Sequence, residues 1–63
     1  MPVIHVDMLA GRDKETKAKL IKELTDTYCR ITGNAPQSVT IIMRDIAHEN
    51  WGRAGEPMPP PKG

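Results

Sequence analysis

The chain lacks phenylalanine and has one tryptophan, one tyrosine and one cysteine among its 63 residues. The lone Cys29 excludes an internal disulfide, and the two histidines lie too far from it in sequence to form a structural zinc site. The net charge of +1 and the scarcity of aromatic rings argue against nucleic-acid binding, which needs a basic surface and rings for stacking. No apolar run reaches the length of a membrane span. We therefore expect a cytoplasmic protein with no metal, membrane or nucleic-acid partner.

The small size of the chain limits how it can be stabilised. Its 63 residues form a single domain, residues 1–63, which is too short to bury a large core. Because no disulfide or metal site is expected, association with other chains is the remaining source of stability. The sequence therefore predicts an obligate oligomer.

Two segments of alternating polarity, residues 3–9 and 38–44, predict β-strands. The segment between them predicts an amphipathic helix, with Asp13 as the N-cap and Gly33 as the left-handed stop. Two strands joined by a helix of about 19 residues are most simply connected by a right-handed crossover, which makes them parallel. The predicted fold class is therefore α/β, a β-α-β protomer with a short C-terminal hairpin.

The predicted helix covers one face of the two strands and leaves the other face open. The uncovered face carries apolar Val3, Leu9 and Ile42, and we expect another subunit to cover it. The apolar arc of the helix, which excludes Cys29, consists of Leu20, Ile21, Leu24, Tyr28 and Ile31.

Glycine and proline dominate the C-terminal part. Residues 51–56 contain glycines spaced for a turn or short hairpin. Residues 57–63 contain four of the six prolines, which have no N–H group to donate to a sheet. We expect this Pro-rich tail to be polyproline-like or disordered at the surface.

An ordered set of features resembles a known family. The features are Pro2 after Met1, an alternating strand, Gly11-Arg12 before a single helix, Ser38-Val39 at the start of the second strand, and Trp51-Gly52 after it. In this combination the chain resembles the 4-oxalocrotonate tautomerase family over about residues 2–56, which is all of it except the tail.

The resemblance implies a β-α-β protomer that forms dimers through joined sheets and assembles into a hexamer with active sites between subunits. It also implies cofactor-free proton transfer by an amino-terminal proline. The expected substrates are small carboxylic acids, namely unsaturated 2-hydroxy or 2-oxo acids such as 2-hydroxymuconate. A homo-hexamer is the expected assembly, with a hetero-oligomer as the alternative.

Pro2 becomes the first residue once Met1 is removed, and its secondary amine is then a candidate base. Such a base works best when its pKa lies near the working pH. Burial and neighbouring cations both favour the neutral amine. The alternative is that Pro2 merely begins a strand, where its missing N–H is harmless. The resemblance favours the catalytic role.

Three further residues concern the charge of the substrate. Arg12 lies just before the helix, where the helix dipole disfavours a cation, so the position suits an anion. The resemblance implies that Arg12 binds a substrate carboxylate, with a solvated arginine as the alternative. It also implies a second arginine where this chain has Thr40, whose hydroxyl brings no charge. We predict that Arg53 replaces that cation, with a plain surface arginine as the alternative.

The remaining candidates line the expected pocket. Trp51 matches the aromatic residue that excludes water from the amine in the family, although packing at an interface explains it equally well. Leu9 and Ser38 also match pocket positions, and both serve strand packing just as well.

The sequence thus favours a cofactor-independent isomerase. One alternative keeps the scaffold: a protonated Pro2 acts as an acid while Glu49 or Glu56 activates water for hydration or dehalogenation. Another alternative is a non-catalytic oligomeric subunit, or one half of a mixed oligomer, which the missing charge at Thr40 would permit.

Overall fold

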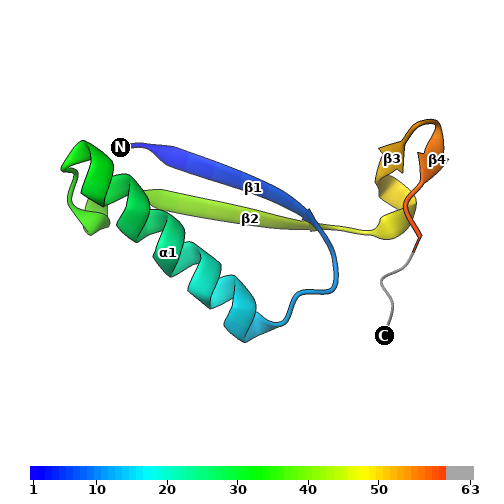
Figure 1. Ribbon diagram of the computed structural model, residues 1–63, viewed down its shortest axis with the longest axis horizontal. Coiled ribbons are helices and arrows are strands. Elements are labelled where there is room, and N and C mark those ends of the chain that lie inside the picture. The colour runs from blue at the N-terminus through cyan, green and yellow to red at the C-terminus, as the bar shows by residue number, and fades with distance from the viewer. Residues whose placement is uncertain (60–63) are drawn as a thin grey trace.

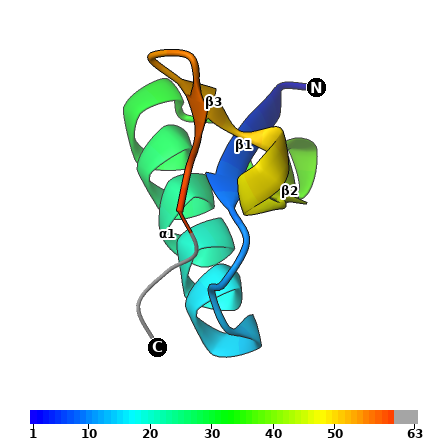
Figure 2. The same cartoon turned by 90° about the vertical axis from the view of Figure 1, so that its right-hand side faces the viewer.

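The computed structural model describes residues 1–59. Strands β1 (Val3–Leu9) and β2 (Thr40–Ile46) pair in parallel along their whole length, which confirms the predicted β-α-β unit. The helix lies along one face of the two strands (Figure 1, Figure 2). In chain order the elements are β1 (Val3–Leu9), α1 (Lys14–Thr32), the 3-10 turn η1 (Pro36–Ser38), β2 (Thr40–Ile46), the 3-10 turn η2 (His48–Asn50), and hairpin strands β3 (Gly52–Arg53) and β4 (Glu56–Pro57).

Both ends of α1 are capped as predicted. The Asp13 side chain accepts a hydrogen bond of 2.8 Å from the Thr16 N–H. Hydrogen bonding to Thr16, first from its side chain and then from its backbone N–H, lowers the pKa of Asp13. At the other end Gly33 adopts φ 80°, and its N–H donates to the Cys29 carbonyl over 2.8 Å. The caps fix the first turn of the helix and, with it, the loop that carries Arg12.

The apolar arc of the helix was predicted only in part. Cys29, which was predicted to lie outside the arc, is half-buried. Ile21 and Ile31, which were predicted to belong to the arc, remain 40% and 70% exposed. A helix is about 10 Å wide whereas two strands lie about 5 Å apart, so a two-stranded sheet leaves the flanks of the arc open. Within one chain, therefore, the helix face is only partly covered.

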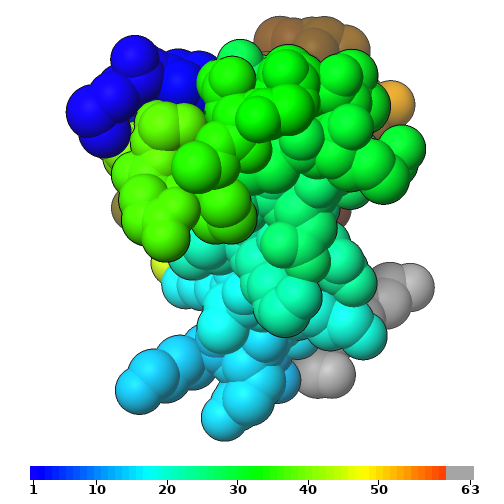
Figure 3. Space-filling model, turned by 90° about the vertical axis from the view of Figure 1, so that its left-hand side faces the viewer, coloured from blue at the N-terminus to red at the C-terminus, as the bar shows by residue number. Residues whose placement is uncertain are grey.

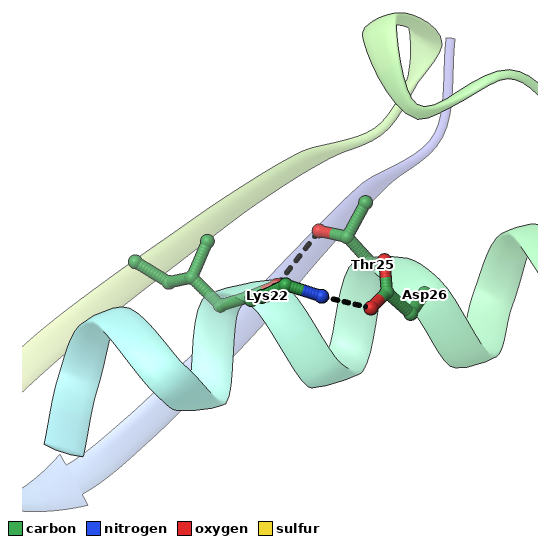
Figure 4. A network of polar contacts seen from close by, with 4 residues as sticks. Lys22, Thr25 and Asp26 are labelled. Carbon is green, nitrogen blue, oxygen red and sulfur yellow. Dashed lines mark hydrogen bonds and ion pairs between the residues drawn. The ribbon is translucent and has the colours of Figure 1, made fainter.

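The far side of α1 is solvated and polar. Lys22 donates to Asp26 over 2.6 Å, and this bond is the main cause of the raised pKa of Lys22 (Figure 4). The Thr25 hydroxyl donates to the Ile21 carbonyl over 2.7 Å. Exposed pairs of this kind contribute little to stability, so the pairing of Lys22 with Asp26 does not hold the fold together.

The second strand begins two residues later than predicted and continues to Ile46. Ser38 lies in η1, where its hydroxyl donates to the Ala35 carbonyl over 2.8 Å. The N–H of Val39 is also used by this turn, since it donates to the Pro36 carbonyl. Thr40 is consequently the first residue of this segment to bond to the N-terminal segment.

The outer face of the sheet is uncovered in one chain, as predicted. Val3 and Ile42 are 48% and 41% exposed, whereas Leu9 at the strand end is half-buried. Asp7 and Arg44 stand opposite each other on this face and form two hydrogen bonds of 2.7 and 2.9 Å. The hydrogen bond from Arg44 is the main cause of the lowered pKa of Asp7.

The C-terminal hairpin is confirmed, but the tail prediction was wrong at its start. Pro57 belongs to β4, and the Met58 N–H donates to the Trp51 carbonyl over 2.8 Å. Proline is tolerated there because β4 is an edge strand of two residues. Ala54 and Gly55 turn the hairpin with φ of 54° and 82°, the signs of a type I′ turn. The rest of the predicted tail, residues 60–63, lies outside the described residues.

A single protomer is open rather than compact. Among residues 1–59 none is buried. The radius of gyration is 14.4 Å, against about 10.6 Å for a compact chain of this length. The accessible surface of 5012 Å² likewise exceeds the roughly 4,000 Å² of a compact monomer of this mass. Over the same residues, no helix has the length and apolarity to cross a membrane.

Candidate functional site

Three of the predicted site residues meet where the sheet begins. The Thr40 N–H donates to the Pro2 carbonyl over 3.0 Å, and Ser38 precedes Thr40 by two residues. All three side chains are half-buried. Figure 3 shows the N-terminal residues at the surface, beside the end of α1 and the segment that leads into β2. We call Pro2, Ser38 and Thr40 the amine end.

The nitrogen of Pro2 is an amide as long as Met1 precedes it. Met1 is 89% exposed, so its removal costs no packing. Removal would leave a secondary amine at the tip of β1, next to the backbone of Thr40. The fold therefore presents Pro2 in a position where a free amine would be accessible from outside the chain.

The opposite end of the sheet carries Leu9 and Arg12. The Ala10 N–H donates to the Ile46 carbonyl over 2.9 Å, which closes the pairing of β1 with β2. Arg12 follows in the loop before α1 and is exposed. An ion pair between Lys17 and Asp45 ties the first turns of α1 to the end of β2. Leu9 and Arg12 thus lie at the end of the sheet opposite Pro2.

Trp51 and Arg53 lie beyond the same end of the sheet. The Trp51 N–H donates to the His48 carbonyl over 3.2 Å, and the half-buried Trp51 begins the hairpin that presents Arg53. Our sequence analysis assigned no role to His48. Its Nε2 atom is buried and has no hydrogen-bond partner within residues 1–59. We call Leu9, Arg12, Trp51 and Arg53 the cation end.

Arg12 and Arg53 are available to bind an anion. Within residues 1–59 neither side chain forms a hydrogen bond or an ion pair. Arg44, by contrast, is held by both carboxylate oxygens of Asp7. Our sequence analysis missed the pairing of Asp7 with Arg44. The two residues are direct neighbours in the parallel register of β1 and β2.

One chain does not bring the amine end and the cation end together. The seven residues of β1 separate them, which at about 3.3 Å per residue amounts to about 20 Å. Figure 1 shows the N-terminus and the β3–β4 hairpin at opposite ends of the molecule. The described part of a single chain contains no pocket and no cluster of metal-ligating side chains.

The profile of the tautomerase enzyme family matches residues 2–58, which is nearly the whole described chain. The chain belongs to the tautomerase family. The expected resemblance to 4-oxalocrotonate tautomerase is thereby confirmed, and the match includes both the amine end and the cation end.

Individual tautomerases show the same relationship. A probable tautomerase of Ralstonia nicotianae is 39% identical over 57 residues, covering 90% of this chain and 81% of the relative. The crystal structure of apo unfused 4-OT superposes with a TM-score of 0.86 at 32% identity, covering 90% of this chain and 93% of that one. A structure described for trans-3-chloroacrylic acid dehalogenase activity superposes with a TM-score of 0.83 at 29% identity, covering 92% and 100%.

Proposed function

We propose that this protein is a cofactor-independent tautomerase that moves a proton along an unsaturated 2-hydroxy or 2-oxo acid, with the amine of Pro2 as the general base. The observation that supports this most is the arrangement along β1. Pro2 stands at one end of the strand, where removal of Met1 would free its amine. Arg12 and Arg53, which have no partner among residues 1–59, stand beyond the other end.

The proposed active site is shared between copies. Strands β1 and β2 form a two-stranded sheet, so each has an outer edge with unpaired backbone groups. A second copy running antiparallel along such an edge would bring its cation end next to the amine end of the first. The exposed Val3 and Ile42 offer a further face for contacts between dimers. We propose a homo-hexamer built in this way, in which Pro2 and Arg12 of one site come from different copies.

The proposed chemistry is a proton shuttle. The neutral Pro2 amine accepts the proton of a dienol hydroxyl and then returns it to a carbon further along the conjugated chain. Bonds shift but no atom is gained or lost, so the reaction is an isomerisation. Nearby cations and the exclusion of water by Trp51 would favour the neutral amine, because both lower the pKa of an amine.

The other site residues hold the substrate. Arg12 would bind a substrate carboxylate through two parallel hydrogen bonds, and Arg53 would replace the second cation that the resemblance implies at Thr40. Leu9 would supply part of the apolar wall. Ser38 already donates its hydroxyl proton to the Ala35 carbonyl, so we assign it the support of the turn before Thr40.

Arg12→Ala should mainly weaken substrate binding. Loss of a charge-assisted hydrogen bond costs about 1.5–3 kcal/mol, so we expect kcat/KM to fall about 10- to 100-fold, chiefly through KM. Arg30→Ala is the matched control, because Arg30 is exposed in the last turn of α1. Steady-state kinetics with an enol acid should separate the two variants. Equal kinetics for both would remove Arg12 from the site, and Arg53→Ala tests the second cation in the same way.

The likeness to the structure described for dehalogenase activity supports a second candidate function on the same scaffold. A protonated Pro2 would act as an acid while Glu49 or Glu56, both exposed, activates water. Chloride release from trans-3-chloroacrylate, with no isomerisation of enol acids, would favour this function. A protein inactive in both assays would be the non-catalytic subunit.

A further inference from the structure

The outer face of the sheet combines apolar side chains with one pair of opposite charges. Alternation along β1 and β2 places eight residues on this face: Val3, His5, Asp7, Leu9, Thr40, Ile42, Arg44 and Ile46. Among these eight, only Asp7 and Arg44 are charged when His5 is neutral, and they stand directly opposite each other in the register. The face therefore carries both signs of charge and no net charge.

The chain exposes more surface than a folded monomer of its mass. Its accessible surface of 5012 Å² exceeds the expected value by about 1,000 Å², whereas a standard protein interface covers about 800 Å² of each partner. The outer face is part of this excess, since Val3 and Ile42 are 48% and 41% exposed. A protein-sized partner is therefore expected on it.

The pair of Asp7 with Arg44 still has hydrogen-bonding groups to offer. The guanidinium donates from Nε to Oδ1 of Asp7 over 2.7 Å and from a terminal nitrogen to Oδ2 over 2.9 Å. It has further N–H donors, and each carboxylate oxygen keeps a lone pair. In one chain these groups face water, because the side chains of Arg44 and Asp7 are 64% and 41% exposed. A partner that covers the face has to replace that water.

A second copy of the same face meets this requirement. A partner with charge of one sign would satisfy either Asp7 or Arg44 and would bring a like charge to the other, which is unfavourable in a desolvated contact. A twofold axis beside the pair would instead place Asp7 of each chain next to Arg44 of the other. The free N–H groups of each guanidinium would then meet the free lone pairs of the other chain's carboxylate. The pair is thus self-complementary.

We propose that the outer sheet face binds a second copy of this chain, and that the pair of Asp7 with Arg44 makes the contact selective for identical chains. The choice between a homo-oligomer and a hetero-oligomer is then made on this face. The inference rests on the part of the proposed function that assigns the face to contacts between copies. It is independent of proton transfer by Pro2.

Exchange of the two charges within one chain tests the inference. A chain with Asp7→Arg and Arg44→Asp keeps a pair of opposite charges and should assemble with itself. Next to an unmodified chain, however, it would bring carboxylate to carboxylate and guanidinium to guanidinium. Unmodified and exchanged chains should therefore sort into separate assemblies when they are unfolded together and refolded. The two chains have the same mass, so one is labelled with ¹⁵N before native mass spectrometry.

Exchange of Lys22 and Asp26 is the matched control. These residues also pair, over 2.6 Å, but they lie on the exposed side of α1. A chain with Lys22→Asp and Asp26→Lys should mix at random with unmodified chains, which in a hexamer leaves about 3% of assemblies with one kind of chain. Exchange on the sheet should raise that fraction at least about tenfold. Random mixing of the sheet variant would overturn the inference.

Asp7→Asn provides a second readout that does not need the exchanged chain. It leaves Arg44 without a counter-charge inside the contact, so the assembly should dissociate at a protein concentration at least about tenfold higher than that of Asp26→Asn, as measured by sedimentation. Equal dissociation of the two variants would also overturn the inference. Activity of the unmodified assembly toward an enol acid tests the proposed function separately, and an inactive assembly without Met1 would contradict that function instead.

Discussion

Protein that retains Met1 should show no more than about one hundredth of the tautomerase activity of protein from which Met1 has been removed, because a positioned general base contributes about 10²–10⁴-fold. With Met1 attached, the Pro2 nitrogen is an amide and has no usable basicity. The fold should be unchanged, since Met1 is 89% exposed. Both forms should be identified by intact mass and compared with the same enol acid.

Enzymatic removal of Met1 from the retained form provides the internal control. Activity should rise in proportion to the fraction of chains that lose Met1, at constant protein concentration. Circular dichroism before and after cleavage would show whether the fold is the same. Equal activity of the two forms would show that the Pro2 amine is not the base, so that another residue would have to transfer the proton.

Two proteins of low activity should become more active when they are mixed and assayed at a substrate concentration well below KM. Chains that retain Met1 lack the base but keep Arg12, whereas Arg12→Ala chains without Met1 keep the base. If each site takes Pro2 and Arg12 from different copies, random assembly of equal amounts leaves both residues intact in about a quarter of the sites. Unfolding the two proteins together and refolding them should therefore restore about a quarter of the specific activity of unmodified protein.

The same treatment of each protein alone is the control and should leave its low activity unchanged. Mixing without unfolding should act slowly or not at all, because subunits of a stable oligomer exchange slowly. A refolded mixture no more active than its two components would show that Pro2 and Arg12 act within one chain. The 20 Å or so that β1 places between them would then require a different fold in solution.

Most of the protomer could be predicted because its signals are local. Asp13 and Gly33 each act within one helical turn, so the ends of α1 agree with the sequence-based bounds. The alternation of β1 likewise needs no knowledge of distant residues. The start of β2 was predicted two residues too early, because the Val39 N–H is used by the turn at Pro36 and not by the sheet.

Burial was harder to predict because it depends on what the helix covers. Ile31 belongs to the apolar arc by its position, yet it is 70% exposed because two strands are too narrow to cover it. Pro57 was assigned to the tail on the ground that it cannot donate to a ladder. The hydrogen bonding of the hairpin continues instead through the Met58 N–H, which donates to the Trp51 carbonyl. The proline content of the segment does not predict this bond.

The candidate site could be named residue by residue but not assembled. The resemblance supplied Pro2, Arg12 and Trp51, and the family match confirms the resemblance without testing the roles. The structure adds that Pro2 and Arg12 lie at opposite ends of β1. The sequence of one chain does not state which copy provides each residue, because that depends on contacts between chains.

Direct titration of the Pro2 nitrogen tests the proposed chemistry most closely. Protein labelled with ¹⁵N-proline and freed of Met1 has one proline amine, whose ¹⁵N shift reports its ionisation by NMR. The pKa should lie below that of an ordinary proline amine, and kcat/KM should rise with pH through the same value, because only the neutral amine accepts a proton. An amine that titrates at its ordinary pKa, while activity follows a different ionisation, would contradict Pro2 as the base.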